Sequence, residues 1–127
     1  MPVRILIVDD EPALLRMMSA YLGRLGYEVE TAGGTEGAWK RIEADPGGFA
    51  VAVLDATMPG LSLDELALRA LRAAPDLRVI ATSGYPVDMS EIQAAGKGRV
   101  AFLPKPFTPE MLAEMLRRML GPKEEAV

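Results

Sequence analysis

Short, almost wholly apolar runs alternate along this chain with longer segments in which apolar residues recur every three or four positions. The short runs predict strands at residues 3–8, 27–31, 50–55, 77–82 and 100–103. The longer segments predict helices at residues 12–25, 35–44, 63–73, 89–95 and from 109 onward. Because strands that are apolar on both sides are typical of parallel sheets covered by crossover helices, we expect a doubly wound α/β fold with a five-stranded parallel sheet and five helices.

Start and stop signals support this order of elements. Pro12 and Pro109 stand where a first helical turn tolerates proline, and Thr108 suits an N-cap. Residues 62–65 (Ser-Leu-Asp-Glu) have the pattern of a capping box, and residues 45–48 (Asp-Pro-Gly-Gly) predict a loop. The helices should therefore begin close to these positions.

The size and hydropathy of the chain favour one domain. It has 127 residues, half of them apolar, which is enough for one sizeable core. We expect a domain at residues 1–121 and a short tail at residues 122–127 without a linker to an output domain, which favours a free-standing protein. No run is long enough to span a bilayer and the start does not resemble a signal peptide, so we expect a cytoplasmic protein without membrane contact.

The composition also limits the chemistry. The chain has no cysteine and no histidine, which excludes thiol and imidazole nucleophiles and means that it cannot itself be a phosphohistidine donor. A metal would have to be bound by oxygen, which favours Mg²⁺, Mn²⁺ or Ca²⁺. A net charge of −4 with scattered Lys and Arg argues against a nucleic-acid partner.

Acidic residues follow two of the predicted strands. Asp9 and Asp10 end the first strand and Asp55 ends the third. Because parallel strands end at one edge of a sheet, these side chains should converge within a few ångströms. Each pair of like charges at ~4 Å costs roughly 4 kcal/mol at an effective dielectric of about 20, so a cation would relieve the cluster. For Asp9, Asp10 and Glu11, helix capping stays an open alternative.

Asp55 and two further positions, Ser83 and Lys105, stand at or near the carboxyl ends of strands. Asp55 closes the apolar run 50–54 and precedes Met-Pro-Gly at 58–60, although a turn residue would also fit there. Ser83 lies in Thr-Ser-Gly, which alone is an ordinary turn signal. Lys105 lies between two prolines, which restrict the backbone, allow a cis bond to Pro106 and would aim the ammonium.

Taken together, Val8-Asp9-Asp10-Glu11, Asp55 before Met58-Pro59-Gly60, Ser83, and the segment 102–107 (Phe-Leu-Pro-Lys-Pro-Phe) resemble the response regulator receiver domain. The resemblance covers essentially the whole chain. It implies a flavodoxin-like fold with strand order 2-1-3-4-5, an order that the sequence pattern does not itself give.

The resemblance also implies a chemistry. Asp55 would accept a phosphoryl group from a phosphohistidine of a sensor histidine kinase or a histidine phosphotransfer protein. Asp10, Asp55 and the backbone carbonyl of Thr57 would bind Mg²⁺ (or Mn²⁺) directly, Asp9 would act through water, and Lys105 would pair with phosphoryl oxygens. The protein would be a phosphoacceptor switch that catalyses only its own phosphorylation and dephosphorylation.

For the switch, the resemblance implies that Ser83 supplies a hydroxyl that moves toward the phosphoryl group and that Phe102 is a rotating aromatic. Core packing is the alternative for Phe102. Thr57 and Tyr85 would tune dephosphorylation. Downstream protein partners would bind around the fourth helix, fifth strand and fifth helix.

The last helix and one loop add two observations. Six apolar residues of the last helix form either a wide buried stripe or a partly exposed partner surface: Met111, Leu112, Met115, Leu116, Met119 and Leu120. Ser62 and Leu63 stand where receivers commonly have Asp-Gly, which makes the loop beside Asp55 and its docking of a kinase less predictable.

Three other functions fit parts of the pattern. An aspartyl-phosphate hydrolase would need an Asp-x-Asp motif, which residues 9–11 lack. A flavodoxin-like cofactor binder would need a loop of Ser, Thr and Gly after the first strand, where an acidic loop would repel phosphate. A receiver-shaped module that docks proteins without phosphorylation stays the main alternative.

Overall fold

The five predicted strands form one parallel sheet in the order β2-β1-β3-β4-β5. The computed structural model describes residues 2–121. The strands are β1 (Arg4–Val8), β2 (Glu28–Ala32), β3 (Val51–Asp55), β4 (Arg78–Ser83) and β5 (Val100–Pro104). The helices are α1 (Pro12–Arg24), α2 (Thr35–Ala44), α3 (Leu63–Ala73), α4 (Ser90–Gly96) and α5 (Pro109–Leu120). The predicted fold class and the strand order are confirmed.

The element boundaries differ from the predicted ones by one residue at several ends. β2 begins at Glu28 rather than at residue 27, because the amide of Tyr27 bonds back to Leu22 at the end of α1. β4 and β5 extend to Ser83 and Pro104, which are partners in the sheet register. The predicted tail at residues 122–127 lies outside the described residues.

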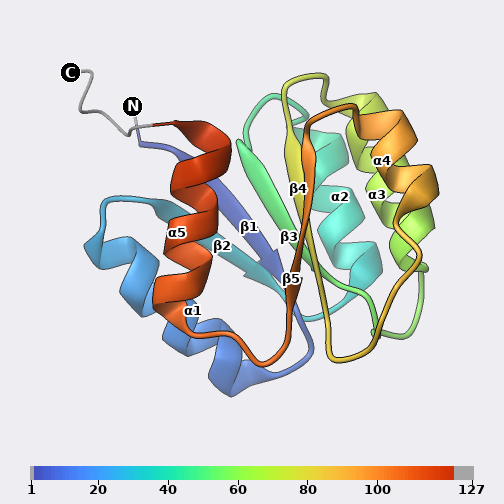
Figure 1. The fold of residues 1–127 in the computed structure, drawn as a ribbon. Helices are drawn as coiled ribbons and strands as arrows, with labels where there is room; N and C mark the ends of the chain where they lie inside the picture. The colour runs from blue at the N-terminus through green and yellow to red at the C-terminus, as the bar shows by residue number, and fades with distance from the viewer. Residues whose placement is uncertain (1, 122–127) are drawn as a thin grey trace.

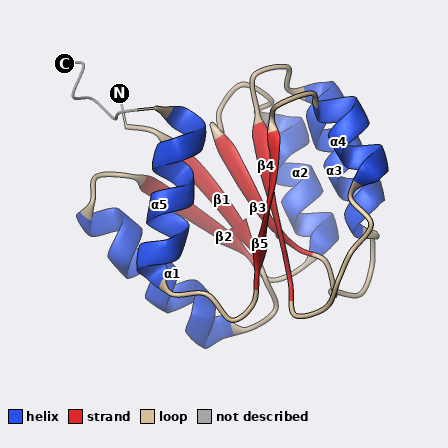
Figure 2. Cartoon of the chain, viewed as in Figure 1, coloured by secondary structure: helices blue, strands red, loops and turns tan. Residues whose placement is uncertain are grey.

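Helices cover both faces of the sheet (Figures 1 and 2). α1 and α5 lie on one face, and α2, α3 and α4 lie on the other. A hydrophobic core lies on each face of the sheet, and alternate residues of a strand pack into one core or the other. Ile5 and Ile7 of β1 pack on the α1/α5 side, while Leu6 and Val8 pack on the opposite side. Burial on both faces explains why β1 and β3 are almost wholly apolar, whereas the edge strand β2 carries two glutamates and is less buried.

The predicted helix caps are present. The Ser62 hydroxyl accepts a hydrogen bond from the Glu65 amide, and the Glu65 carboxylate accepts one from the Ser62 amide, each at 3.1 Å. The Thr108 hydroxyl accepts from the Met111 amide at 3.0 Å. In the apolar stripe of α5, Leu112 and Leu116 are buried, Met111 is 42% exposed, and the other three residues are half-buried against the same core: Met115, Met119 and Leu120.

No helix within residues 2–121 has both the length and the apolar character that a membrane span requires.

An ion-pair network lies at the end of the sheet where β1 begins. The Arg4 guanidinium bonds to the carboxylates of Glu30 and Asp45, the latter at 2.9 Å, and lies 4.5 Å from the centre of the Phe49 ring. Arg41 contacts the second oxygen of Glu30 at 2.9 Å. The hydrogen bond from Arg4, with the added charge of Arg41, holds the pKa of Glu30 below its ordinary value.

This network predicts a pH-dependent contribution to stability. Because the pKa of Glu30 is lowered on folding, its contribution is present above the ordinary carboxyl pKa and is lost as the pH falls through the lowered value. Glu30→Gln should reduce the free energy of unfolding by about 0.5–1 kcal/mol at pH 7, and by less in acid. Urea unfolding at pH 7 and pH 3 measures this difference, with the exposed Glu28→Gln of the same strand as control. An equal deficit at both pH values would contradict the assignment.

Candidate functional site

Three carboxylates converge at the carboxyl edge of the sheet, as the sequence predicted. One oxygen of each of Asp9, Asp10 and Asp55 lies within 4.8 Å of the others. β1 and β3 are neighbours with Val8 opposite Leu54, so the residues that follow Val8 and Leu54 come together. Asp9 and Asp55 are buried, at 2% and 5% exposure, whereas Asp10 is exposed.

The turns after β1 and β3 fix one oxygen of each buried carboxylate. Asp55 Oδ1 accepts hydrogen bonds from the amide of Thr57 at 3.1 Å and from its hydroxyl at 3.0 Å. Asp9 Oδ1 accepts from the amide of Glu11 at 3.0 Å. Glu11 is the N-cap residue of α1 but makes no side-chain cap bond. Asp9 therefore forms a turn just before α1 and belongs to the cluster, whereas the alternative of side-chain capping by this segment is not supported.

Lys105 reaches the same carboxylates from the end of β5. Its Nζ lies 2.9 Å from Asp9 Oδ2 and 3.3 Å from Asp55 Oδ2. Its backbone amide donates to the carbonyl of Ser83 at 2.8 Å, and the Lys105–Pro106 peptide bond is cis, as the flanking prolines allowed. The ion pair with Asp9 was not predicted from the sequence, since it depends on which strand ends are neighbours in space.

The charges of the cluster are only partly balanced. Burial by itself would lower the pKa of Lys105, but the hydrogen bonds and charges of Asp9 and Asp55 together raise this pKa above its ordinary value. One ammonium against three carboxylates still leaves negative charge in excess. The ligand atoms are all oxygen, which is the donor type that hard divalent cations prefer. Asp9, Asp10 and Asp55 could therefore hold such an ion.

Ser83 and Phe102 lie together beside Lys105. Ser83 is the last residue of β4, is 1% exposed, and its Oγ accepts from the amide of Tyr85 at 3.0 Å. Phe102 is half-buried on β5 and packs against the core that contains α4. Both residues line a cavity of about 280 Å³ that also touches Lys105 and Tyr85. The structure thus brings the predicted hydroxyl and aromatic residues to one place.

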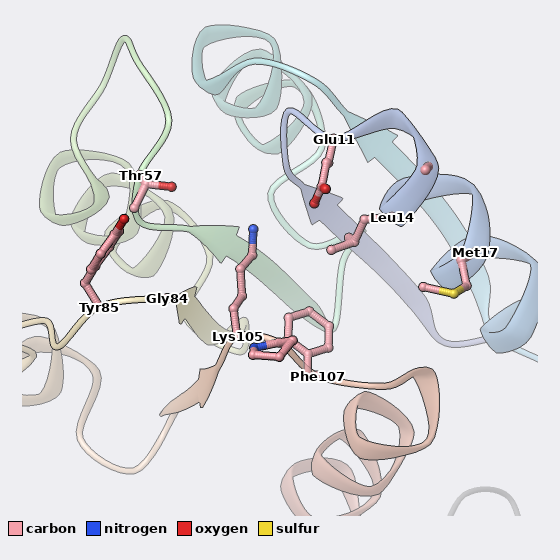
Figure 3. A pocket seen from close by; sticks show the side chains of 10 residues that line it. Glu11, Leu14, Met17, Thr57, Gly84, Tyr85, Lys105 and Phe107 are labelled. Atoms are coloured by element: carbon pink, nitrogen blue, oxygen red, sulfur yellow. The ribbon is translucent and has the colours of Figure 1, made fainter.

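A larger cavity of about 770 Å³ opens beside the carboxylate cluster. In Figure 3, Thr57 and Tyr85 lie on one side of it, Glu11 and Met17 lie on the opposite side, and the Lys105 side chain extends between them. Its walls also include further apolar residues: Ala13, Leu14, Pro106 and Phe107.

This lining was not predicted from the sequence. Met17, one of the periodic apolar residues of α1, is 50% exposed and borders the cavity. Glu11 adds a carboxylate to the rim. Helical periodicity gives the apolar face of a helix but not the part of that face which the rest of the fold leaves open.

Comparisons with known proteins agree with this architecture. The family model described as response regulator receiver domain matches residues 5–117. The DNA-binding transcriptional regulator NtrC of Azospirillum brasilense is 33% identical over 92% of this chain, which spans only 24% of that relative's length. Chemotaxis protein CheY1 of Helicobacter pylori is 31% identical over 94% of this chain and 98% of its own. The crystal structure of a CheY-like receiver domain protein from Methanospirillum hungatei is 29% identical, with a TM-score of 0.85 over the whole of both chains.

The position of Lys105 predicts a large contribution to stability in metal-free protein. Lys105→Met should reduce the free energy of unfolding by about 2–3 kcal/mol at pH 7, because two buried carboxylates would lose their shared counter-charge. The loss is smaller than for a fully buried ion pair because the lysine is partly exposed. Since the pKa of Lys105 is raised from 10.5, the contribution is complete below that pH and is lost as the pH rises through the raised value.

Urea unfolding in a chelating buffer measures this effect. The matched control is Lys40→Met, which removes an exposed lysine of α2. If Lys105→Met and Lys40→Met unfolded at the same urea concentration, the ion pairs of Lys105 would contribute nothing.

Proposed function

This chain belongs to the response regulator receiver domain family, and we propose that it accepts a phosphoryl group on Asp55 from a phosphohistidine donor in a Mg²⁺-dependent reaction. Receiver domains are phosphoacceptor switches that interact with sensor kinases and downstream effectors, rather than conventional enzymes. The observation that carries the proposal is the position of the buried Asp55 carboxylate, with Oδ2 beside the Lys105 ammonium and two further carboxylates around it.

The two oxygens of Asp55 have different environments. Oδ1 is occupied by the amide and hydroxyl of Thr57, whereas Oδ2 lies 3.3 Å from Lys105 Nζ. We assign Oδ2 as the nucleophile. Its bond to phosphorus forms as the P–N bond of the donor breaks, and the released imidazole nitrogen keeps the electron pair of that bond. Lys105 stabilises the negative oxygens of the transferring group from a fixed position.

The proposed ion is Mg²⁺, with Mn²⁺ as a substitute. Asp10, Asp55 and the backbone carbonyl of Thr57 would hold it directly, and Asp9 would act through water. When bound, the ion would offset the excess negative charge of the carboxylates and of the incoming phosphoryl group. The all-oxygen cluster of three carboxylates supports this assignment.

Ser83 is proposed as the switch hydroxyl. Its Oγ accepts the hydrogen bond from the Tyr85 amide, so its own O–H proton remains available to a phosphoryl oxygen on Asp55. Phe102 lines the same cavity and packs against the core beneath α4. Movement of Ser83 would therefore change the packing of Phe102 next to α4. The output surface would then consist of α4, β5 and α5, where downstream proteins bind.

Thr57 and Tyr85 are proposed to tune the lifetime of the phosphoryl group. The Thr57 hydroxyl bonds to Asp55, and Tyr85 is 72% exposed at the cavity rim. Both therefore lie where water would approach the acyl phosphate. The donor would be a sensor histidine kinase or a histidine phosphotransfer protein, with residues 1–121 as the receiver unit.

Intact mass spectrometry tests the phosphoacceptor assignment. Incubation with acetyl phosphate and MgCl₂ should add one phosphoryl group to the wild type and none to Asp55→Asn, and chelation should prevent the gain. Asp76→Asn, which changes an exposed residue just before β4 at the opposite edge of the sheet, should behave as the wild type. A folded wild type that gained no mass would favour the phosphorylation-independent docking module instead.

The role of Ser83 can be separated from phosphoryl acceptance. Ser83→Ala should still gain the phosphoryl group, because Asp55 and Lys105 are untouched. It should lose most of the change in amide chemical shifts of α4, β5 and α5 that phosphorylation causes in the wild type. Two-dimensional NMR with and without phosphodonor measures this response, with Ser19→Ala of α1, outside this surface, as control. Equal shift changes in Ser83→Ala and wild type would refute the switch role.

A further inference from the structure

The loop between β3 and α3 carries Thr57 and is fixed at both of its ends. At the start, the Ala56 amide donates to the Thr82 carbonyl at 2.8 Å. At the end, Ser62 and Glu65 form the capping box of α3. The segment 57–61 lies between these two points, and a residue of another element contacts it.

That residue is Thr35, the first residue of α2. Its side chain is almost wholly buried, with 4% of the residue exposed. Its hydroxyl donates to the Pro59 carbonyl at 3.3 Å and accepts from the Leu61 amide at 2.9 Å. One hydroxyl therefore satisfies both a carbonyl and an amide of the loop, and a buried hydroxyl is costly unless it is bonded in this way.

Gly60 shows how closely the loop wraps around this hydroxyl. Its φ of +98° lies in the left-handed region that favours glycine. A Cβ added to Gly60 would lie 2.4 Å from Thr35 Oγ1, which is too close for any real side chain. The loop conformation and the Thr35 hydroxyl are thus fitted to each other, with backbone groups on both sides of Gly60 turned toward it.

We infer that Thr35 is a positioning residue for the acceptor site, an inference that rests on the proposed function. Its hydroxyl bonds to the loop and not to Asp55. It acts through the loop, because Thr57 lies between the fixed Ala56 and the Pro59 that Thr35 holds. Thr57 in turn bonds to Asp55 Oδ1 and would offer its carbonyl to Mg²⁺. Without the hydroxyl, the loop would lose its two hydrogen bonds to α2, at Pro59 and at Leu61.

The test compares Thr35→Val, which keeps the branched shape but removes the hydroxyl, with Thr35→Ser, which keeps it. Hydrogen exchange of the Leu61 amide should be faster in Thr35→Val and close to the wild type in Thr35→Ser. Calorimetric titration with MgCl₂ should show a dissociation constant raised about tenfold in Thr35→Val, the fold-change equivalent to one hydrogen bond of ordinary net strength. Phosphorylation by acetyl phosphate should approach the wild-type rate at saturating MgCl₂.

Ile42→Val is the control for general loss of stability. It removes one buried methylene-sized group about two turns further along the same helix and should leave Mg²⁺ affinity unchanged. Unchanged Mg²⁺ binding in Thr35→Val, or equal weakening in Ile42→Val, would overturn the inference. A folded wild type that fails to bind Mg²⁺ would instead overturn the proposed function, and the positioning role with it, whatever the exchange of Leu61 shows.

Discussion

The repulsion among Asp9, Asp10 and Asp55 is the constraint on which the rest of the site depends. Two of these carboxylates are buried, where an unpaired charge is costly, and a single ammonium from Lys105 contacts both. The strand order fixes this arrangement, because it places the ends of β1 and β3 side by side. Lys105, which follows β5, reaches the carboxylates from there. The cluster consequently favours added positive charge, of the kind that a divalent cation bound by oxygen ligands would supply.

The charged residues at the two ends of the strands are arranged in opposite ways. Where β1 begins, Arg4, Arg41, Glu30 and Asp45 pair off in a network that stabilises the fold. Where the strands end, carboxylates are gathered in excess. Proteins give up local stability in this manner at functional sites and recover it elsewhere. Here the stability comes from two well-packed cores, one on each face of the sheet.

The loops that surround the cluster are held by specific side chains rather than by chain stiffness alone. Thr57 fixes one oxygen of Asp55, and Thr35 fixes the loop that carries Thr57. The departure at Ser62 and Leu63 leaves the start of α3 well capped, because Ser62 and Glu65 satisfy each other's amides. Loop order around Asp55 therefore comes from this chain's own hydroxyl groups, and Ser83 adds another at the end of β4.

The sequence by itself determined the number and kind of elements, the parallel sheet, the caps at Ser62 and Thr108 and the placement of the three aspartates at the carboxyl ends of strands, because period, capping chemistry and strand ends are local properties. The strand order came from the resemblance to receivers, since local pattern does not say which strands are neighbours. Tertiary structure alone decided that Lys105 pairs with Asp9, that Met17 borders a cavity and that the Thr35 hydroxyl holds the loop after Asp55. These contacts join residues far apart in the chain, and only the packing of strands and helices sets such distances.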